Sequence, residues 1–184
     1  MNNNLLGLIF GLASALIWGG GDFSGGMAAR RSHTIQVMAI TSFAGLAAML
    51  ALALLTGESW PRGVDYAWAG AAGAIGALGI VLLFDGLSKR AAAIVAPTSA
   101  LVGTALPVLV SVLMEGLPSP AQMAGILVGV AGIWLVSRPP GEVTPEMRRL
   151  FWLAAASGVC FGTFFIFIAQ VSTDSLFAPL TISK

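Results

Sequence analysis

The chain has 184 residues, of which 57% are hydrophobic and only 9% are charged. A soluble domain carries about 25% charged residues, so nine basic and eight acidic side chains cannot cover a water-soluble globule of this size. The mean hydropathy of +0.91 and the net charge of +1 argue against a soluble enzyme, a disordered chain and a nucleic-acid binder. We therefore expect an all-α integral membrane protein, a polytopic helix bundle.

Six apolar windows are long enough to cross a bilayer, which takes about 20 helical residues. They lie near Leu5–Ala29, Thr34–Leu55, Tyr66–Leu87, Ala92–Met114, Pro120–Ser137 and Leu150–Val171. The first window has no preceding positive charge and is too long for a secretory signal, which favours a membrane helix. The sequence predicts six transmembrane helices, with Asp22 and Asp85 as the charges inside them.

The cysteine, histidine and glycine residues of the sequence indicate what the helices can bind and how they can pack. One cysteine, Cys160, and one histidine, His33, are too few for a disulfide or a zinc site built on His and Cys. We expect no metal and no cofactor, and Cys160 is interpreted as a packing residue. Glycines recur at helical spacing and predict close helix packing. They are Gly7 and Gly11, then Gly70, Gly73, Gly76 and Gly79, and finally Gly125, Gly129 and Gly132.

Lys and Arg are unevenly distributed between the two sides. Arg30, Arg31, Lys89, Arg90, Arg138, Arg148 and Arg149 follow the first, third and fifth windows, whereas Arg62 alone lies in the opposite loops. The end residue Lys184 is unassigned. By the positive-inside rule this bias places the odd-numbered loops in the cytoplasm and the N-terminus outside.

A short internal repeat links the first and sixth windows. A shift of 143 residues lays Ala13–Gly19 over Ala156–Gly162, with three identical positions and with Trp18-Gly19 over Phe161-Gly162. The two windows cross in opposite directions, as in the inverted repeats of secondary transporters, whose sites lie near the membrane midplane. We expect residues 1–143 to form a first five-helix repeat and residues 144–184 to begin a second. Two such units need roughly 286 residues, so we expect the chain to be a truncated part of a longer protein.

Several segments together resemble the EamA-like family of the drug/metabolite transporter superfamily. The opening helix contains Ala15–Gly19, and a later hairpin runs from Leu83–Leu87 to the proline-bearing Ala92–Pro97. Glu115, with the following Pro118–Pro120, resembles the turn that closes the first repeat of the family. The resemblance implies ten helices in two inverted repeats and both termini in the cytoplasm, in conflict with the charge bias.

The resemblance also implies a function. It implies a transporter, not an enzyme, that exports small organic metabolites across the plasma (inner) membrane by alternating access, with proton coupling left open. The partners expected are a small-molecule substrate and the lipid bilayer; no nucleic acid is expected, and a homodimer is left open. A non-transporting scaffold or accessory subunit remains the alternative.

Two carboxylates are candidates for binding or coupling. Asp22 lies one helical turn beyond Trp18, on the same helix face. It is either a substrate- or proton-binding group or a residue that reaches headgroups or Arg30. Asp85 lies four residues before Lys89, and an ion pair is the favoured interpretation. Gly19–Asp22 also fits the GxGD pattern of intramembrane aspartyl proteases, with Asp85 as second aspartate, a remote alternative.

The remaining candidates are aromatic residues, prolines and one glutamate. Trp18 and Phe161 are expected either to face each other across a cavity or to pack as ordinary helix residues. Pro97 interrupts the fourth window, together with Pro107, and frees backbone carbonyls beside the hydroxyl of Thr98. Glu115 is interpreted as a structural residue of the turn that follows.

Overall fold

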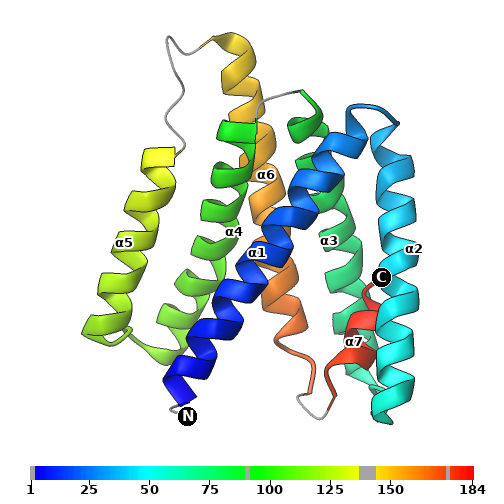
Figure 1. Cartoon of the computed structure of the whole chain (residues 1–184). Coiled ribbons are helices and arrows are strands. Elements are labelled where there is room, and N and C mark those ends of the chain that lie inside the picture. Colours follow the sequence, from blue (N-terminus) through cyan, green and yellow to red (C-terminus); the bar gives the residue numbers. More distant parts are fainter. Residues whose placement is uncertain (1–2, 90–91, 137–143, 173–174) are drawn as a thin grey trace.

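The computed structural model describes residues 3–89, 92–136, 144–172 and 175–184. Within these ranges the chain forms seven helices and no strand (Figure 1), which confirms the all-α prediction. The helices are α1 (Asn3–Ala29), α2 (Thr34–Thr56), α3 (Val64–Ser88), α4 (Ala92–Glu115), α5 (Pro120–Val136), α6 (Pro145–Ile168) and α7 (Phe177–Ile182).

Five helices, α1, α2, α3, α4 and α6, are long and apolar enough to cross a membrane, each with at least 23 residues. The helix at the fifth predicted span, α5, is apolar but has only 17 residues, and Ser137 lies outside the described residues. The structure therefore gives five spans by the criterion of length, together with a sixth, shorter apolar helix. Most predicted bounds agree within two residues.

The predicted start of the sixth span, Leu150, is wrong by five residues. The hydroxyl of Thr144 accepts a hydrogen bond from the Met147 N–H, at 3.2 Å, and Pro145 occupies the first turn. A threonine cap and an N-terminal proline start a helix efficiently. The helix therefore begins in the polar segment, before the apolar residues on which the prediction relied.

Two other helix ends have recognisable signals. At the end of α2, Gly57 has a φ of 66°. Its N–H and that of Glu58 bond to the Leu54 and Ala53 carbonyls, which is a Schellman motif. At the start of α5, the side-chain oxygen of Gln122 accepts a hydrogen bond from the Ser119 N–H at 2.9 Å, as in a capping box. Both turns are thus fixed by local sequence.

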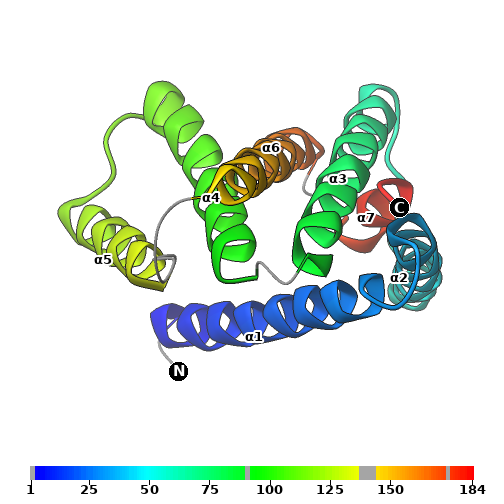
Figure 2. The same ribbon diagram turned by 90° about the horizontal axis from the view of Figure 1, so that it is seen from above.

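The helix α6 lies at the centre of the arrangement, between α3 and α4 (Figure 2). The short helix α7 packs against α2 and α3, while α5 packs against α4 at the far edge. In Figure 2, α1 forms a separate layer that reaches α2 and α3 near its C-terminal end. Most of α1 and α5 is consequently exposed.

The buried apolar core lies at the end of the bundle where α1 and α3 finish and α2, α4 and α6 begin (Figure 1). It consists of Ala29, Val37, Leu83, Phe84, Leu87, Val95, Leu150 and Ala154. The Arg30 guanidinium donates hydrogen bonds of 3.3 Å to the Leu87 carbonyl, so it links α1 to the C-terminal turn of α3, where a cation is favourable.

The basic residues gather at this same end. Figure 1 shows that the C-terminal ends of α1, α3 and α5 share it with the N-terminal ends of α2, α4 and α6. Arg30, Arg31, Lys89, Arg148 and Arg149 lie here, and Arg62 lies at the opposite end; Arg90 and Arg138 are outside the described residues. The basic residues of the loops are therefore concentrated at one end of the bundle. Which end faces the cytoplasm stays a prediction.

Close packing over glycine is confirmed for α3 and wrong for α1 and α5. An added Cβ at Gly76 would lie 2.9 Å from Phe164, and one at Gly79 would lie 3.1 Å from Cys160. Gly73 contacts the Ser183 backbone. No described atom lies within 4 Å of such a Cβ at Gly7, Gly11, Gly70, Gly125, Gly129 or Gly132. The reason is that α5 packs mainly against α4 within the described part of the chain. The helix α1 uses other glycines, Gly25 and Gly26, against α3.

Candidate functional site

A small cavity of about 50 Å³ lies where α1, α2, α3, α6 and the end of the α7 segment meet. It is lined by Trp18, Ser42, Gly73, Gly76, Ala77, Ile80, Phe161, Phe164, Ser183 and Lys184. We call it the midplane cavity, because its lining residues from α1, α2 and α3 lie near the middles of those helices. Gly76 is the central residue of α3, and Trp18 lies two residues beyond the centre of α1.

Trp18 and Phe161 both line the midplane cavity. Trp18 comes from α1 and Phe161 from α6, so the structure brings together two aromatic side chains that lie 143 positions apart. Trp18 is 53% exposed, and Phe161 also packs against the buried core. Their role in binding stays a prediction.

Lys184 also lines the cavity, and sequence reasoning assigned it no role. Its side-chain carbons lie 3.3 Å (Cε) and 3.5 Å (Cδ) from the position of a Cβ at Gly45, the central residue of α2. Figure 1 shows the C-terminal end of the chain at about mid-height of α2. The available signal was its position after an apolar segment with no other charge, but α7, which precedes Lys184, is too short to be recognised as a span.

Asp22 lies outside the cavity lining, one helical turn beyond Trp18 in α1. It is half-buried, and its carboxylate accepts no hydrogen bond and forms no ion pair with a described residue. In particular, the Arg30 guanidinium bonds to the Leu87 carbonyl instead. A carboxylate at this depth without a fixed partner is able to exchange a proton or bind a cation.

Asp85 lies near the end of α3 and forms the expected ion pair with Lys89. The two side chains are 40% and 39% exposed, respectively. Asp85 does not line the midplane cavity. The structure therefore places it with the charged groups at the membrane edge and does not join it to Trp18 and Phe161.

Pro97 and Thr98 lie in the first part of α4, away from the midplane cavity. Thr98 is buried, and so is the adjacent Ser99. The Ser99 hydroxyl lies 3.1 Å from the Ser157 hydroxyl of α6. These polar side chains thus lie at a contact between helices, and the structure does not bring Pro97 or Thr98 to Trp18.

The sequence of most of the chain matches a known protein family. Residues 5–138 match the model of the EamA-like transporter family, which is 134 of the 184 residues. The chain belongs to the EamA-like transporter family. The predicted family is confirmed, and with it a multi-pass membrane protein of the drug/metabolite transporter type. No curated protein and no solved structure gives a significant match.

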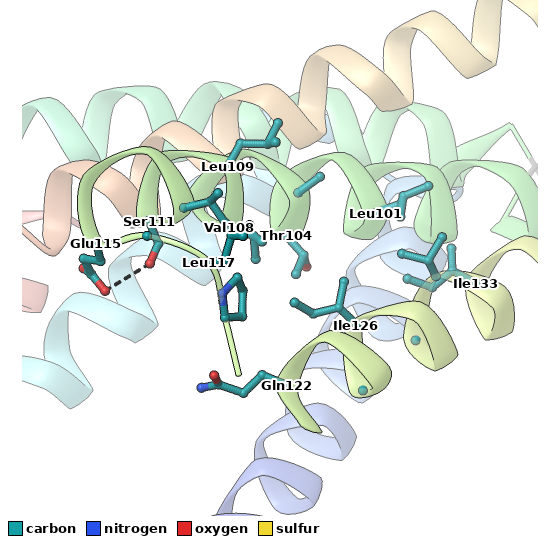
Figure 3. A pocket seen from close by; sticks show the side chains of 17 residues that line it. Leu101, Thr104, Val108, Leu109, Ser111, Glu115, Leu117, Gln122, Ile126 and Ile133 are labelled. Atoms are coloured by element: carbon teal, nitrogen blue, oxygen red, sulfur yellow. Dashed lines mark hydrogen bonds between the residues drawn. The ribbon is translucent and has the colours of Figure 1, made fainter. Parts of the chain in front are cut away.

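The EamA-like chain has a second, larger cavity of about 890 Å³ between α4 and α5 (Figure 3). Its lining is mainly aliphatic, with Leu101, Val108, Ile126 and Ile133 among the side chains in Figure 3. It lies at the edge of the bundle, between two sequence neighbours, and Gly125 and Gly129 form part of its wall. A groove of this kind suits lipid or another helix. The large volume of this cavity therefore does not identify it as the substrate site.

Glu115, the last residue of α4, also lines this larger cavity. Its carboxylate accepts a hydrogen bond of 3.1 Å from the Ser111 hydroxyl, within α4 (Figure 3). The following turn is held instead by Ser119 with Gln122 and by Gly116, which has a φ of 95°. The capping-box spacing was the sequence signal for this turn.

The arrangement of acidic residues gives no support to protease chemistry in this EamA-like protein. Two aspartates that share a proton must lie within hydrogen-bond distance. The carboxylate of Asp85 is paired with Lys89, and no hydrogen bond joins Asp85 to Asp22. Among the described residues, no group of three or more His, Cys, Asp or Glu side chains is placed to hold a metal ion.

Proposed function

We propose that the protein is a secondary transporter that exports small organic metabolites across the plasma membrane by alternating access, with the midplane cavity as its substrate site. Family membership supports transport of this general type. The observation that carries the choice of site is the meeting of Trp18 and Phe161 at one cavity at mid-depth. Substrate sites of transporters built from repeats lie at this depth, between the repeats.

The relation between α1 and α6 supports two inverted repeats. The two helices run in opposite directions through the bundle (Figure 1). They carry the matching segments Ala13–Gly19 and Ala156–Gly162. In this proposal α1 opens the first repeat and α6 opens the second, and the cavity lies where the two repeats touch.

In this proposal the midplane cavity is in a closed conformation. A volume of about 50 Å³ is well below the roughly 300–1,000 Å³ of ordinary ligand sites. Binding therefore requires a helix to move. The three residues Gly19, Gly20 and Gly21 follow Trp18 in α1, and an added Cβ at any of them would have no described neighbour within 4 Å. Glycine weakens a helix interior by about 1 kcal/mol per residue, so α1 is suited to bend beside the cavity.

Asp22 is the proton-coupling group in this proposal. It lies one turn from Trp18, is half-buried and has no fixed partner among the described residues. A proton bound there in one conformation and released in the other would couple export to the proton gradient. Asp85 is unsuited to this role because Lys89 holds it.

Transport by the full-length protein in lipid vesicles tests the proposal. Flux of a broad panel of small metabolites is measured with and without an imposed pH gradient. We expect flux of at least one solute and its acceleration by the gradient. Asp22→Asn should abolish the acceleration, whereas Glu146→Gln, at an exposed site in the first turn of α6, should retain it. Absence of flux for every solute would contradict transport, and full coupling in Asp22→Asn would remove Asp22 from the mechanism.

A further inference from the structure

Packed residues lie on both sides of the midplane cavity, along the seam between α3 and α6. On the side of the basic residues, Phe84 of the buried core follows the lining residue Ile80 on α3 by one helical turn. On the opposite side, Trp68 lies five residues before the lining residue Gly73, which is about 7 Å of helix. The Trp68 ring packs against Phe167 of α6, with the ring centroids 5.3 Å apart. A path for a solute along this seam must open one of the two sets of contacts.

Hydrogen bonds hold the end of the bundle that lies beyond the aromatic pair. The Glu58 carboxylate, just after α2, accepts hydrogen bonds from the Phe177 and Ala178 N–H groups, at 2.7 and 2.9 Å. The Asp65 carboxylate, in the first turn of α3, accepts one of 2.9 Å from the Ser172 hydroxyl, just after α6. Figure 1 shows that α2 and α6 end, and α3 and α7 begin, at this end. We call the contacts of these five residues the polar closure.

The two sides differ in what their opening exposes. In the polar closure, Glu58 and Asp65 are half-buried and Ser172 is exposed, so water at the membrane edge can replace each partner. Such an exchange costs only the modest net value of a hydrogen bond. The opposite side is an apolar core of eight buried residues, which would come into contact with water if it opened. The polar closure is therefore the weaker of the two.

We infer that the polar closure is the gate of the midplane cavity, and that the cavity opens first at the end of the bundle opposite the basic residues. This inference rests on the proposed function, because it states how the proposed substrate site is reached. In the closed state Glu58 and Asp65 hold the start of α7 and the segment after α6. In the open state water solvates both carboxylates, and Trp68 separates from Phe167.

Chemical modification of a cysteine in the cavity tests the inference without requiring transport. Ser42→Cys places a thiol in the cavity lining, with Cys160 and any further cysteine of the full-length protein replaced by alanine. The reagent is 2-(trimethylammonium)ethyl methanethiosulfonate, which is too large to enter a closed cavity of about 50 Å³. The rate of modification of the purified protein therefore reports opening. We expect the rate to rise about 10-fold in Glu58→Ala, because two charge-assisted hydrogen bonds are lost, and further when Asp65→Ala is added.

Two variants at the opposite end serve as controls. Glu146→Ala removes an exposed carboxylate from the first turn of α6. Arg30→Ala removes the hydrogen bonds to the Leu87 carbonyl, while the apolar core remains. Both should be modified at the wild-type rate. An unchanged rate in the double variant of Glu58 and Asp65, or an equal rise in Arg30→Ala, would overturn the inference.

The native Cys160 distinguishes opening of the gate from general loosening of the fold. Its thiol is buried, and its Cβ lies 3.1 Å from the position of a Cβ at Gly79 in the α3–α6 contact. In Glu58→Ala with Ser42 unchanged, we expect Cys160 to stay as unreactive as in the wild type. A rise at Cys160 equal to that of Ser42→Cys would show that the closure holds the fold together, and would overturn its role as a gate.

Flux in vesicles separates this inference from the proposed function. A one-carbon bis-thiosulfonate reagent should cross-link the pair Asp65→Cys and Ser172→Cys, whose native side chains are hydrogen-bonded. Flux should then stop and return on reduction, whereas Asp65→Cys alone should keep its flux. Flux that survives the cross-link would overturn the gate and leave the transporter proposal intact. Faster modification in Glu58→Ala, without flux of any solute, would support the gate and contradict transport.

Discussion

The hydroxyl of Ser157 on α6 lies 3.1 Å from the hydroxyl of Ser99 on α4. Ser157 also donates a hydrogen bond of 2.9 Å to the Gly79 carbonyl of α3. Because a hydroxyl has one proton, Ser99 must be the donor in the first contact. One fully buried serine thus joins the three central helices, at a point where lipid offers no competing partner.

Ser157→Ala should lower the stability of the bundle by about 1 kcal/mol, because two interhelical hydrogen bonds are lost and interhelical hydrogen bonds in membranes are individually modest. Unfolding in mixed micelles measures the effect. Ser24→Ala is the control, since the Ser24 hydroxyl bonds within its own helix to Gly20. Equal loss of stability in both variants would contradict a special role for the buried serine.

Gly158→Ala should be strongly destabilising, by about 1–3 kcal/mol, because the added Cβ would lie 2.7 Å from both the Ser99 carbonyl oxygen and the Val102 Cβ. Gly129→Ala, on α5, should be neutral or slightly stabilising, since nothing described lies within 4 Å of its Cβ position and alanine favours helix. Thermal unfolding compares the two. A similar loss at both sites would show that the α4–α5 groove is closed by packing.

This contrast shows what sequence reasoning could and could not predict. Hydropathy was enough to locate α1 to α6, because apolar length is a property of each segment alone. Glycine spacing showed which faces permit close approach, but not which neighbour arrives. Gly76 and Gly129 both belong to runs of glycine at helical spacing, and the placement of α6 between α3 and α4 distinguishes their surroundings.

The candidate site was partly predictable for a similar reason. Trp18 and Phe161 could be paired from the sequence, because the predicted repeat places them at corresponding positions. The place of Lys184 in the cavity lining could not be predicted from the sequence, because its position beside Gly45 depends on how α7 packs against α2 and α3. Pro97 and Thr98 were placed with the site on chemistry alone, and the packing of α4 sets them apart from it.

Acidification should loosen the attachment of α7. The Glu58 carboxylate accepts hydrogen bonds from the Phe177 and Ala178 N–H groups, at 2.7 and 2.9 Å. Burial raises the pKa of Glu58, but the backbone N–H groups of Ala178, Leu176 and Phe177 outweigh it and hold that pKa below the ordinary 4.5. A lowered pKa in the folded state stabilises above pH 4.5, and this contribution is lost as the pH falls through the lowered value.

Hydrogen exchange of the α7 peptide, corrected for the intrinsic effect of pH, measures this attachment. At pH 7 we expect faster exchange in Glu58→Ala than in the wild type, and the difference should vanish in acid. Glu146→Ala, whose carboxylate lies in the first turn of α6, is the matched control. Protection that is unchanged by Glu58→Ala at pH 7 would contradict the role of this carboxylate as the cap of α7.

The aromatic pair at the midplane cavity should affect substrate affinity more than turnover. Trp18→Ala and Phe161→Ala each remove apolar contact surface from the lining, and loss of such a contact, about 1.4 kcal/mol, corresponds to a 10-fold change in affinity. We therefore expect KM for the transported solute to rise about 10-fold with kcat nearly unchanged. Trp152→Ala is the control, because Trp152 is 66% exposed and lies outside the cavity. A KM that stays at the wild-type value in both cavity variants would move the substrate site elsewhere. Equal effects at Trp152 would show that loss of an aromatic side chain acts through the fold and not through binding.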